Sequence, residues 1–161
     1  MIDLALYQPQ IPPNTGNCIR LAANIGARLH LIGPMGFDLE EKKVRRAGLD
    51  YRDMACVETH ASFQAFEAYF EKENQQLGLS LDERLLAITT KGETVYWNHS
   101  FKQNDILLFG SEDKGLPSSL HQRLAARRLT IPMTPGSRSL NLSNSVAILA
   151  YRAMESLELA L

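Results

Sequence analysis

The stretch that decides the fold lies at residues 131–154 and reads IPMTPGSRSLNLSNSVAILAYRAM. It predicts a short apolar strand, a polar loop rich in Ser and Asn, and then a long amphipathic helix. Because a helix N-terminus presents unpaired amide donors, and because Ser and Asn side chains organise such donors, this loop is a candidate pocket. A second polar helix start, NTGNCIR, lies at residues 14–20. Two such starts in one small domain predict one composite site.

The composition is that of an ordinary folded chain with a single domain, residues 1–161. Hydrophobic residues make up 45% of it and charged residues 22%, which excludes a disordered protein. No signal peptide is expected, and no apolar stretch approaches the roughly 18 residues that a membrane-spanning helix needs. Cys18 and Cys56 have no metal-binding spacing, so we expect free, buried thiols in a cytoplasmic protein.

The net charge is −1, yet basic residues gather in one region. A helix is predicted between Asp38, its capping residue, and Gly48. Four cations fall within it, namely Lys42, Lys43, Arg45 and Arg46. Such a run can be a solvated helix face. If the partner is a nucleic acid, this is the surface expected to contact its phosphates.

Strands and helices alternate along the chain. Strands are expected at residues 2–7, 28–33, 54–57, 85–89, 105–109 and 129–132. A helix follows the first strand and ends at Gly26, and Ser62 opens another, whose aromatic stripe indicates core packing. Residues 73–83 are polar and are expected to form a surface loop. The alternation predicts an α/β fold with a mainly parallel sheet flanked by helices.

Three polar loops follow strands, at residues 14–17, 109–117 and 137–144. In open α/β sheets ligands bind beyond the carboxyl ends of the strands, so these loops are expected to converge. The dinucleotide fingerprint, the Walker loop and the ligand pairs of a zinc deaminase are absent. The histidines are scattered and are expected at the surface or at strand ends, so no metal site is predicted: His30, His60, His99 and His121.

The three loops resemble the motifs of the SPOUT methyltransferases. The matching segments are NTGNCIR at 14–20, LLFGSEDKGLP at 107–117 and IPMTPGSRSLNLSNSVA at 131–147. Further segments, among them YQPQIPPN, RLHLIGPMGF, RRAGLDY and AITTKG, are similar to the small subfamily that methylates the 2′-oxygen of cytidine or uridine 34 in tRNA. The resemblance covers essentially the whole chain.

This resemblance implies a SPOUT fold with a deep C-terminal trefoil knot, whose wall holds S-adenosylmethionine without a metal. Gly110 would allow close backbone approach, and Ile131 would face the adenine. For Ile88 and Ile131 a plain strand core remains the alternative. The cofactor residues implied are Ile88, Thr89, Thr90, Gly110, Glu112, Gly115, Ile131, Ser139, Asn141 and Tyr151. Tyr151 could instead contact a partner subunit.

The resemblance assigns catalysis to Arg20, Asn14, Glu112 and Asn141, with Arg20 as general base. A guanidinium stays protonated in proteins, so our hypothesis is that Arg20 holds the substrate phosphate or ribose, and that the phosphate assists proton loss. Asn14 could instead be only a helix N-cap. Glu112 could orient Arg20 or a loop amide, or be a surface carboxylate.

The function implied is S-adenosylmethionine-dependent 2′-O-methylation of the wobble nucleotide of tRNA, with leucine tRNAs as expected substrates. The RNA contacts implied are Arg20, Lys42, Lys43, Arg45, Arg46, Lys114 and Arg138. We expect a homodimer with its active site at the subunit interface and no membrane association. The last helix carries an apolar stripe that can face the core, the second subunit or both: Leu142, Val146, Leu149, Ala150, Ala153, Met154 and Leu157.

Three alternatives remain open. The first is methylation of a ribose elsewhere in tRNA or in rRNA. The second is a knotted RNA-binding module without activity, against which the retained Arg20, Glu112 and Asn141 argue. The third is a nucleotide-binding oxidoreductase, which the missing glycine fingerprint disfavours.

Overall fold

The computed structural model describes residues 2–37 and 54–159. The helix predicted between Asp38 and Gly48 therefore lies outside the described residues. The same holds for its four cations, Lys42, Lys43, Arg45 and Arg46.

The centre of the fold is one sheet in which every pair of neighbouring strands is parallel. Its strands are β1 (Asp3–Tyr7), β2 (Arg28–Ile32), β3 (Val57–His60), β4 (Leu85–Ile88), β5 (Thr94–Val95), β6 (Ile106–Phe109) and β7 (Arg128–Thr130). The spatial order is β3-β2-β1-β6-β4-β7-β5. This confirms the predicted α/β fold. The last strand, β7, lies between two strands that precede it in the chain.

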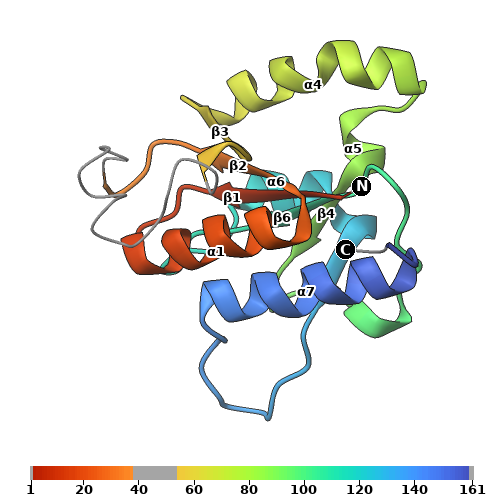
Figure 1. The fold of residues 1–161 in the computed structure, drawn as a ribbon. Coiled ribbons are helices and arrows are strands. Elements are labelled where there is room, and N and C mark those ends of the chain that lie inside the picture. The colour runs from red at the N-terminus through yellow and green to blue at the C-terminus, as the bar shows by residue number, and fades with distance from the viewer. Residues whose placement is uncertain (1, 38–53, 160–161) are drawn as a thin grey trace.

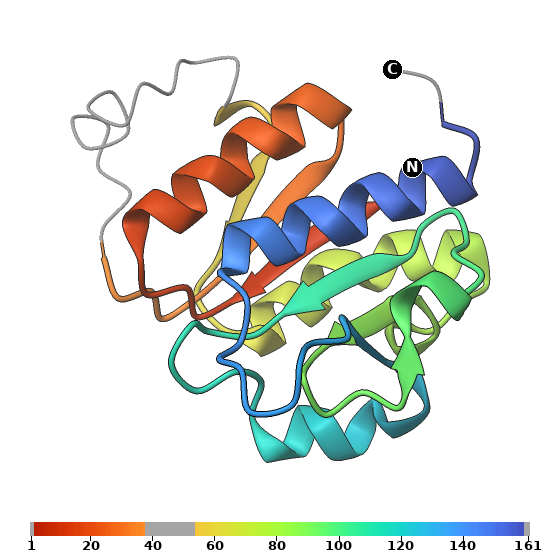
Figure 2. The same ribbon diagram turned by 90° about the horizontal axis from the view of Figure 1, so that it is seen from below.

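Helices cover both faces of the sheet. They are α1 (Pro12–Ile25), α4 (Phe63–Leu77), α5 (Leu81–Arg84), α6 (Ser118–Arg123) and α7 (Leu142–Ser156), with the 3-10 turns η1 (Tyr96–Asn98) and η2 (Ala125–Arg127). Helices α1 and α7 lie side by side on one face, and α4 covers the other (Figures 1 and 2).

Two cores fill the spaces between these layers, because successive side chains of a strand point to opposite faces. In β1, Leu4 and Leu6 belong to the core under α1 and α7. Ala5 belongs to the core on the opposite face, together with Phe66 and Phe70 of α4. Phe66 and Phe70 of the aromatic stripe of α4 therefore pack into the core, as predicted, with Phe63 against them, whereas Tyr69 of the same stripe is 40% exposed.

Helix α1 begins earlier than the sequence suggested. Ile11 is its N-cap residue, and Pro12 and Pro13 occupy the first positions, where a missing amide hydrogen costs nothing. The alternative that Asn14 is the N-cap is therefore wrong, because Asn14 lies inside the first turn and is buried. Gly26 ends the helix in the left-handed conformation, as predicted.

The prediction of a surface loop at residues 73–83 is wrong. Helix α4 continues to Leu77, and Gly78 ends it with a φ of 65°. Ser80 and Glu83 then form a reciprocal capping box that starts α5. The polar run is helical without an apolar period, because Glu73 and Asn74 bond to the buried Arg84 while Gln75 and Gln76 are exposed.

Other boundaries also differ from the prediction. The strand expected at 54–57 is β3, which begins at Val57. Sequence analysis missed β5, α5 and α6, since elements this short show no hydrophobic period; for α5 the spacing of Ser80 and Glu83 was an available capping-box signal.

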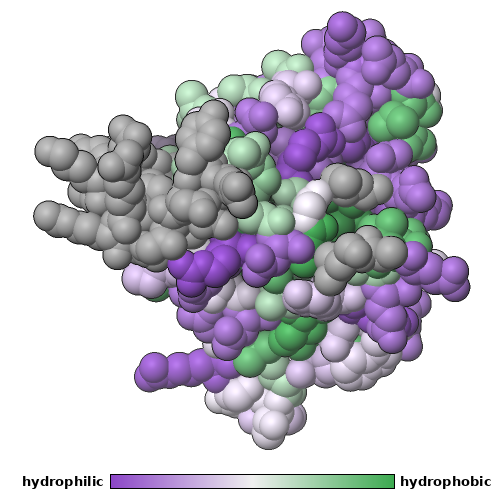
Figure 3. Space-filling model, in the orientation of Figure 1, coloured by the Kyte–Doolittle hydropathy of each residue, from purple (hydrophilic) through white to green (hydrophobic). Residues whose placement is uncertain are grey.

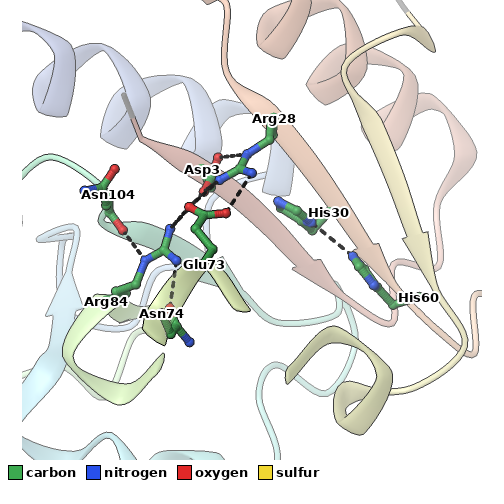
Figure 4. Close-up of polar contacts among 8 residues, drawn as sticks. All are labelled: Asp3, Arg28, His30, His60, Glu73, Asn74, Arg84 and Asn104. Atoms are coloured by element: carbon green, nitrogen blue, oxygen red, sulfur yellow. Dashed lines mark hydrogen bonds and ion pairs between the residues drawn. The ribbon is translucent and has the colours of Figure 1, made fainter. Parts of the chain in front are cut away.

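The polar network around Arg84 ties several elements together at the amino ends of the strands (Figure 4). Arg84 is only 1% exposed, and its guanidinium donates to Asn74 Oδ1 at 2.8 Å and to the Asn104 carbonyl at 2.9 Å. It also pairs with Asp3 and Glu73, which both pair with Arg28. The buried cation is thereby fully engaged by α4 and β1.

Two histidines form a buried pair on the α4 face of the sheet. His30 Nδ1 lies 3.0 Å from His60 Nε2 (Figure 4). Burial is the main reason why the pKa values of both imidazoles are lowered, that of His30 to about 3. His60 ends β3, as expected, but the expectation is wrong for His30, which lies fully buried inside β2. The rings of Phe66 and Phe70 pack against the His30 ring, with centroid distances of 5.5 Å and 4.9 Å.

The apolar stripe of α7 belongs to the core of its own chain. Its members are buried, except for the half-buried Leu157: Leu142, Val146, Leu149, Ala150, Ala153 and Met154. The stripe therefore does not by itself require a second subunit. On the face seen in Figure 3, hydrophilic residues predominate at the α4 end, and hydrophobic residues form smaller separate patches. Among the described residues, no helix has the length and apolarity to cross a membrane.

Candidate active site

A cavity of about 460 Å³ opens where the strands β4, β6 and β7 end. This size is within the range of small-molecule sites, and the place is the carboxyl edge of the sheet, as predicted. Its lining residues are Ile11, Asn14, Ile88, Thr89, Thr90, Lys91, Phe109, Gly110, Ser111, Glu112, Asp113, Lys114, Gly115, Leu116, His121, Ile131, Met133, Ser139, Leu140, Asn141, Leu142 and Ser145.

The loop after β6 turns sharply on itself at one wall of the cavity. A side chain at Gly110 would place its Cβ 2.2 Å from the carbonyl carbon of Gly115 and 2.3 Å from the amide of Leu116. Gly115 has a φ of +68°, and its amide donates to the Ser111 carbonyl at 2.9 Å. The close approach at Gly110 is therefore to the chain's own backbone, which only glycine permits.

Glu112 joins this loop to the start of α1. Its carboxylate accepts hydrogen bonds from the amides of Gln10 at 2.8 Å and Ile11 at 3.2 Å, and from Asn14 Nδ2 at 3.0 Å. Since Ile11 offers no side-chain cap, Glu112 supplies the anion that a helix N-terminus favours. The alternative that Glu112 is only a surface carboxylate is therefore wrong, because it binds the amides at the start of α1.

A second contact joins α1 to α7. Asn141 Nδ2 donates to Asn14 Oδ1 at 2.8 Å, while Asn141 Oδ1 accepts from the amides of Ser143 at 2.9 Å and Asn144 at 3.3 Å. Asn141 is thus the N-cap of α7. Glu112, Asn14 and Asn141 form one hydrogen-bonded chain across three segments that lie far apart in the sequence. We call this chain the polar bridge.

The structure brings most of the predicted site residues to this cavity. Of the predicted cofactor residues, all but Tyr151 line it. Tyr151 lies on α7 and is 50% exposed. Asn14 and Lys114 also line the cavity, whereas Arg20 and Arg138 are exposed and lie outside its wall.

Sequence reasoning missed several lining residues. Lys91, Phe109 and Met133 lie within the quoted segments AITTKG, LLFGSEDKGLP and IPMTPGSRSLNLSNSVA, but they were not assigned to the site. Nothing in the sequence pointed to His121 of α6 or to Ile11, because only the folded chain brings them to the cavity.

The cavity wall carries both signs of charge. Asp113 is exposed, and a hydrogen bond with Ser111 is the main reason why the pKa of its carboxyl is lowered. Lys91 and Lys114 are the lysines of the lining. Burial, assisted by Lys91 and Arg128, lowers the pKa of His121, which favours its neutral form. Such a wall can hold a ligand that carries both a cation and a carboxylate.

Neither of the two cysteines lines the cavity. Cys18 lies fully buried in α1, where burial raises the pKa of its thiol to about 12. Neither Cys18 nor Cys56 forms a disulfide, as expected, but the expectation of burial is wrong for Cys56, which is half-buried. Within residues 2–37 and 54–159, no cluster of three His, Cys, Asp or Glu side chains could hold a metal ion.

Comparison with known proteins shows the family of this chain. The SpoU rRNA Methylase family matches residues 1–151. The chain belongs to the SpoU methylase family. The tRNA (cytidine(34)-2'-O)-methyltransferase of Escherichia coli strain K12 is 48% identical over 158 residues, which is 98% of this chain and 94% of that protein. The enzyme of the same name from Yersinia pestis is 45% identical over 158 residues, again 98% and 94%.

A solved structure that concerns the 2-OH methylation of C/U34 on tRNA superposes with a TM-score of 0.84 and 41% identity. The match covers 98% of this chain and 97% of that one. An AdoMet-bound rRNA methyltransferase from Sinorhizobium meliloti superposes with a TM-score of 0.77 and 25% identity, covering 97% of this chain and 56% of that one. This SpoU methylase therefore has the fold of RNA ribose methyltransferases.

Proposed function

We propose that this SpoU methylase transfers a methyl group from S-adenosylmethionine to the 2′-oxygen of the wobble nucleotide, position 34, of tRNA. The observation that carries the proposal is the polar bridge, which gathers all three motifs at one cavity. Relatives that are 45–48% identical over 98% of the chain carry the name of this activity. The leucine tRNAs are the expected substrates, and we expect the enzyme to act in the cytoplasm, where tRNA is found.

The cavity suits S-adenosylmethionine in size and in chemistry. Ile88 and Phe109 are buried apolar side chains that can cover an adenine ring, with Ile131 beside them. Lys91 and Lys114 can attract the carboxylate of the methionine moiety. When bound, the cofactor supplies an electrophilic methyl group on a sulfonium, without a metal.

In this site the chain's residues align the acceptor oxygen with that methyl carbon. The bound cofactor would supply the methyl carbon for a new C–O bond, its sulfur would keep the pair of the broken C–S bond, and the hydroxyl proton would leave to the neighbouring phosphate or water. Arg20 holds the phosphate or ribose, as a guanidinium can with two parallel donors. Glu112, Asn14 and Asn141 keep their hydrogen-bonding groups on one another, so we assign them to positioning the helices α1 and α7.

Arg20 supports a site shared between two subunits. It lies on the exposed side of α1, away from the buried Cys18, Ile19 and Ala22, and outside the cavity of its own chain. Because Arg20 does not line the cavity of its own chain, we infer that the arginine at each cavity comes from a second copy. We therefore propose a homodimer in which each cavity is completed by the partner. We also propose the C-terminal trefoil knot, which is compatible with the insertion of β7 between β4 and β5.

The activity is tested with pure protein, tRNA and a labelled methyl donor. We expect mass spectrometry of anticodon-loop fragments to place the label on the ribose of nucleotide 34. A tRNA with a 2′-deoxyribose at that position is the control and should remain unlabelled. Label at another ribose would contradict the proposal and favour a different RNA site.

The shared site is tested by mixing two inactive variants. Arg20→Ala lacks the guanidinium, and Thr89→Trp fills the cavity with a large side chain. If Arg20 acts in the partner's cavity, heterodimers contain one intact site, and mixing should restore up to about a quarter of the wild-type rate. Mixtures that stay inactive, with heterodimers present, would contradict the shared site.

A further inference from the structure

Two groups of apolar side chains line the cavity, one buried and one exposed. The inner region consists of Ile88, Phe109 and Leu142, which are buried. The outer region consists of Ile11 and Leu140, which line the same cavity but are 44% and 42% exposed. We call this pair the aliphatic rim.

The aliphatic rim is held in place by the polar bridge. Ile11 is the N-cap of α1, and its amide donates to Glu112. Leu140 directly precedes Asn141, whose side chain donates to Asn14 at 2.8 Å. The rim side chains therefore stand on two elements that the bridge fixes relative to each other, beside the place where we expect the ribose.

The chemistry of methyl transfer between two nucleosides needs this division. The donor is an adenosyl group and the acceptor is a ribose with its own base, so a complete site has two apolar surfaces and a polar centre. The inner region is enclosed, as suits the donor's adenine. The outer region is open to solvent, as suits a base that enters with a large RNA.

We infer that Ile11 and Leu140 hold the base of the methylated nucleotide, a pyrimidine turned out of the anticodon stack. This assignment rests on the proposed function and adds its substrate contact. Neither side chain can donate or accept a hydrogen bond, so the rim grips the face of the base and does not read its edge. A site of this kind accepts cytidine and modified uridines alike, because the two pyrimidines differ at their edges.

The test compares two substrates that differ only in the base. One is a tRNA with cytidine 34, and the other is the same tRNA with an abasic ribose there, which keeps the 2′-hydroxyl. We expect Ile11→Ala and Leu140→Ala each to lower kcat/KM for the cytidine substrate about tenfold. On the abasic substrate the variants and the wild type should have equal rates. Leu140→Met, which keeps a large apolar side chain, should retain most of the wild-type kcat/KM on the cytidine substrate.

Matched controls separate the rim from other effects. Leu79 is 36% exposed and lies outside the cavity, so Leu79→Ala should leave both rates unchanged. The Kd of S-adenosylmethionine, measured by calorimetry, should stay within about twofold in both rim variants.

Three results would overturn the assignment. Equal losses on the cytidine and abasic substrates would show that the rim does not touch the base. A rise in the Kd of S-adenosylmethionine as large as the fall in kcat/KM would place the rim in the cofactor site. Dissociation of the variants in sedimentation would make the rim a subunit contact. A wild type that leaves nucleotide 34 unmodified overturns the proposed function itself, and is recognised without any variant.

Discussion

At the scale of single residues, Glu112 has the most consequential contacts. One carboxylate satisfies two backbone amides at the start of α1 and the amide group of Asn14. A hydrogen bond to a charged group contributes about 1.5–3 kcal/mol to stability. This side chain therefore both stabilises α1 and sets the position of α1 against the loop after β6. Its neighbour Asp113 makes no comparable contact with α1.

We predict that Glu112→Gln lowers kcat/KM for tRNA about tenfold or more, because the amide cannot accept from all three donors. Hydrogen exchange of the Gln10 and Ile11 amides should become faster. Glu71→Gln, an exposed change on α4, is the control and should alter neither quantity. Unchanged exchange at these two amides would contradict the positioning role.

The buried histidine pair makes stability depend on pH. The folded state keeps His30 neutral down to a pKa of about 3, whereas the unfolded chain binds a proton near pH 6.5. Between these values the unfolded state holds more protons, so the free energy of unfolding should fall as the pH falls, by about 1.4 kcal/mol per unit for this group. Above pH 7 the group should have no effect.

Urea unfolding at pH 7.5, 6 and 5 measures this slope. The double variant His30→Leu, His60→Leu should show a flatter dependence than the wild type over the same range. Equal slopes for the two proteins would locate the acid sensitivity elsewhere.

At the scale of elements, the loop after β6 decides the shape of the cavity. It folds back so tightly that the backbone of Gly115 and Leu116 fills the space beside Gly110. The sequence predicted a glycine-dependent approach here, but assigned it to the cofactor. Only the conformation of the loop reveals that the contact is internal.

We predict that Gly110→Ala displaces this loop and raises the Kd of S-adenosylmethionine at least about tenfold. The reason is that the backbone atoms of Gly115 and Leu116 cannot move aside as a flexible side chain can. Gly78→Ala is the matched control. It has a φ of +65° but nothing within 4 Å of its Cβ, so it should cost stability and leave the Kd unchanged. Equal cofactor affinity in Gly110→Ala and wild type would contradict the prediction.

At the scale of the whole molecule, the Arg84 network stabilises the edge of the sheet opposite the cavity. It joins α4, β1 and the turn before β6 through a buried cation. The cavity lies at the opposite, carboxyl ends of the strands, where polar side chains line it.

We predict that Arg84→Met lowers the free energy of unfolding by about 3–5 kcal/mol, because it leaves the buried Asp3 carboxylate with fewer donors. Arg123→Met is the control, since Arg123 pairs with Asp82 and Glu67 at the surface, where such pairs contribute about 1 kcal/mol or less. Urea unfolding measures both. A smaller loss for Arg84→Met than for Arg123→Met would contradict the assignment.

The sequence by itself determined the α/β fold, the parallel sheet and the loops that form the site. Hydrophobic period and strand-end polarity are local properties, and they placed β1, β2, β4, β6 and the long helices close to where the structure has them. The site residues Asn14, Glu112 and Asn141 came instead from the resemblance to the SPOUT methyltransferase motifs.

Only the tertiary structure decided what those residues do. Asn14 is a bridge and not a cap, His30 is buried and not at a strand end, and the stripe of α7 packs into its own chain. Each of these depends on contacts between segments far apart in the sequence, 127 residues apart for Asn14 and Asn141. No local pattern encodes such a contact, because it forms only when separate elements pack against one another.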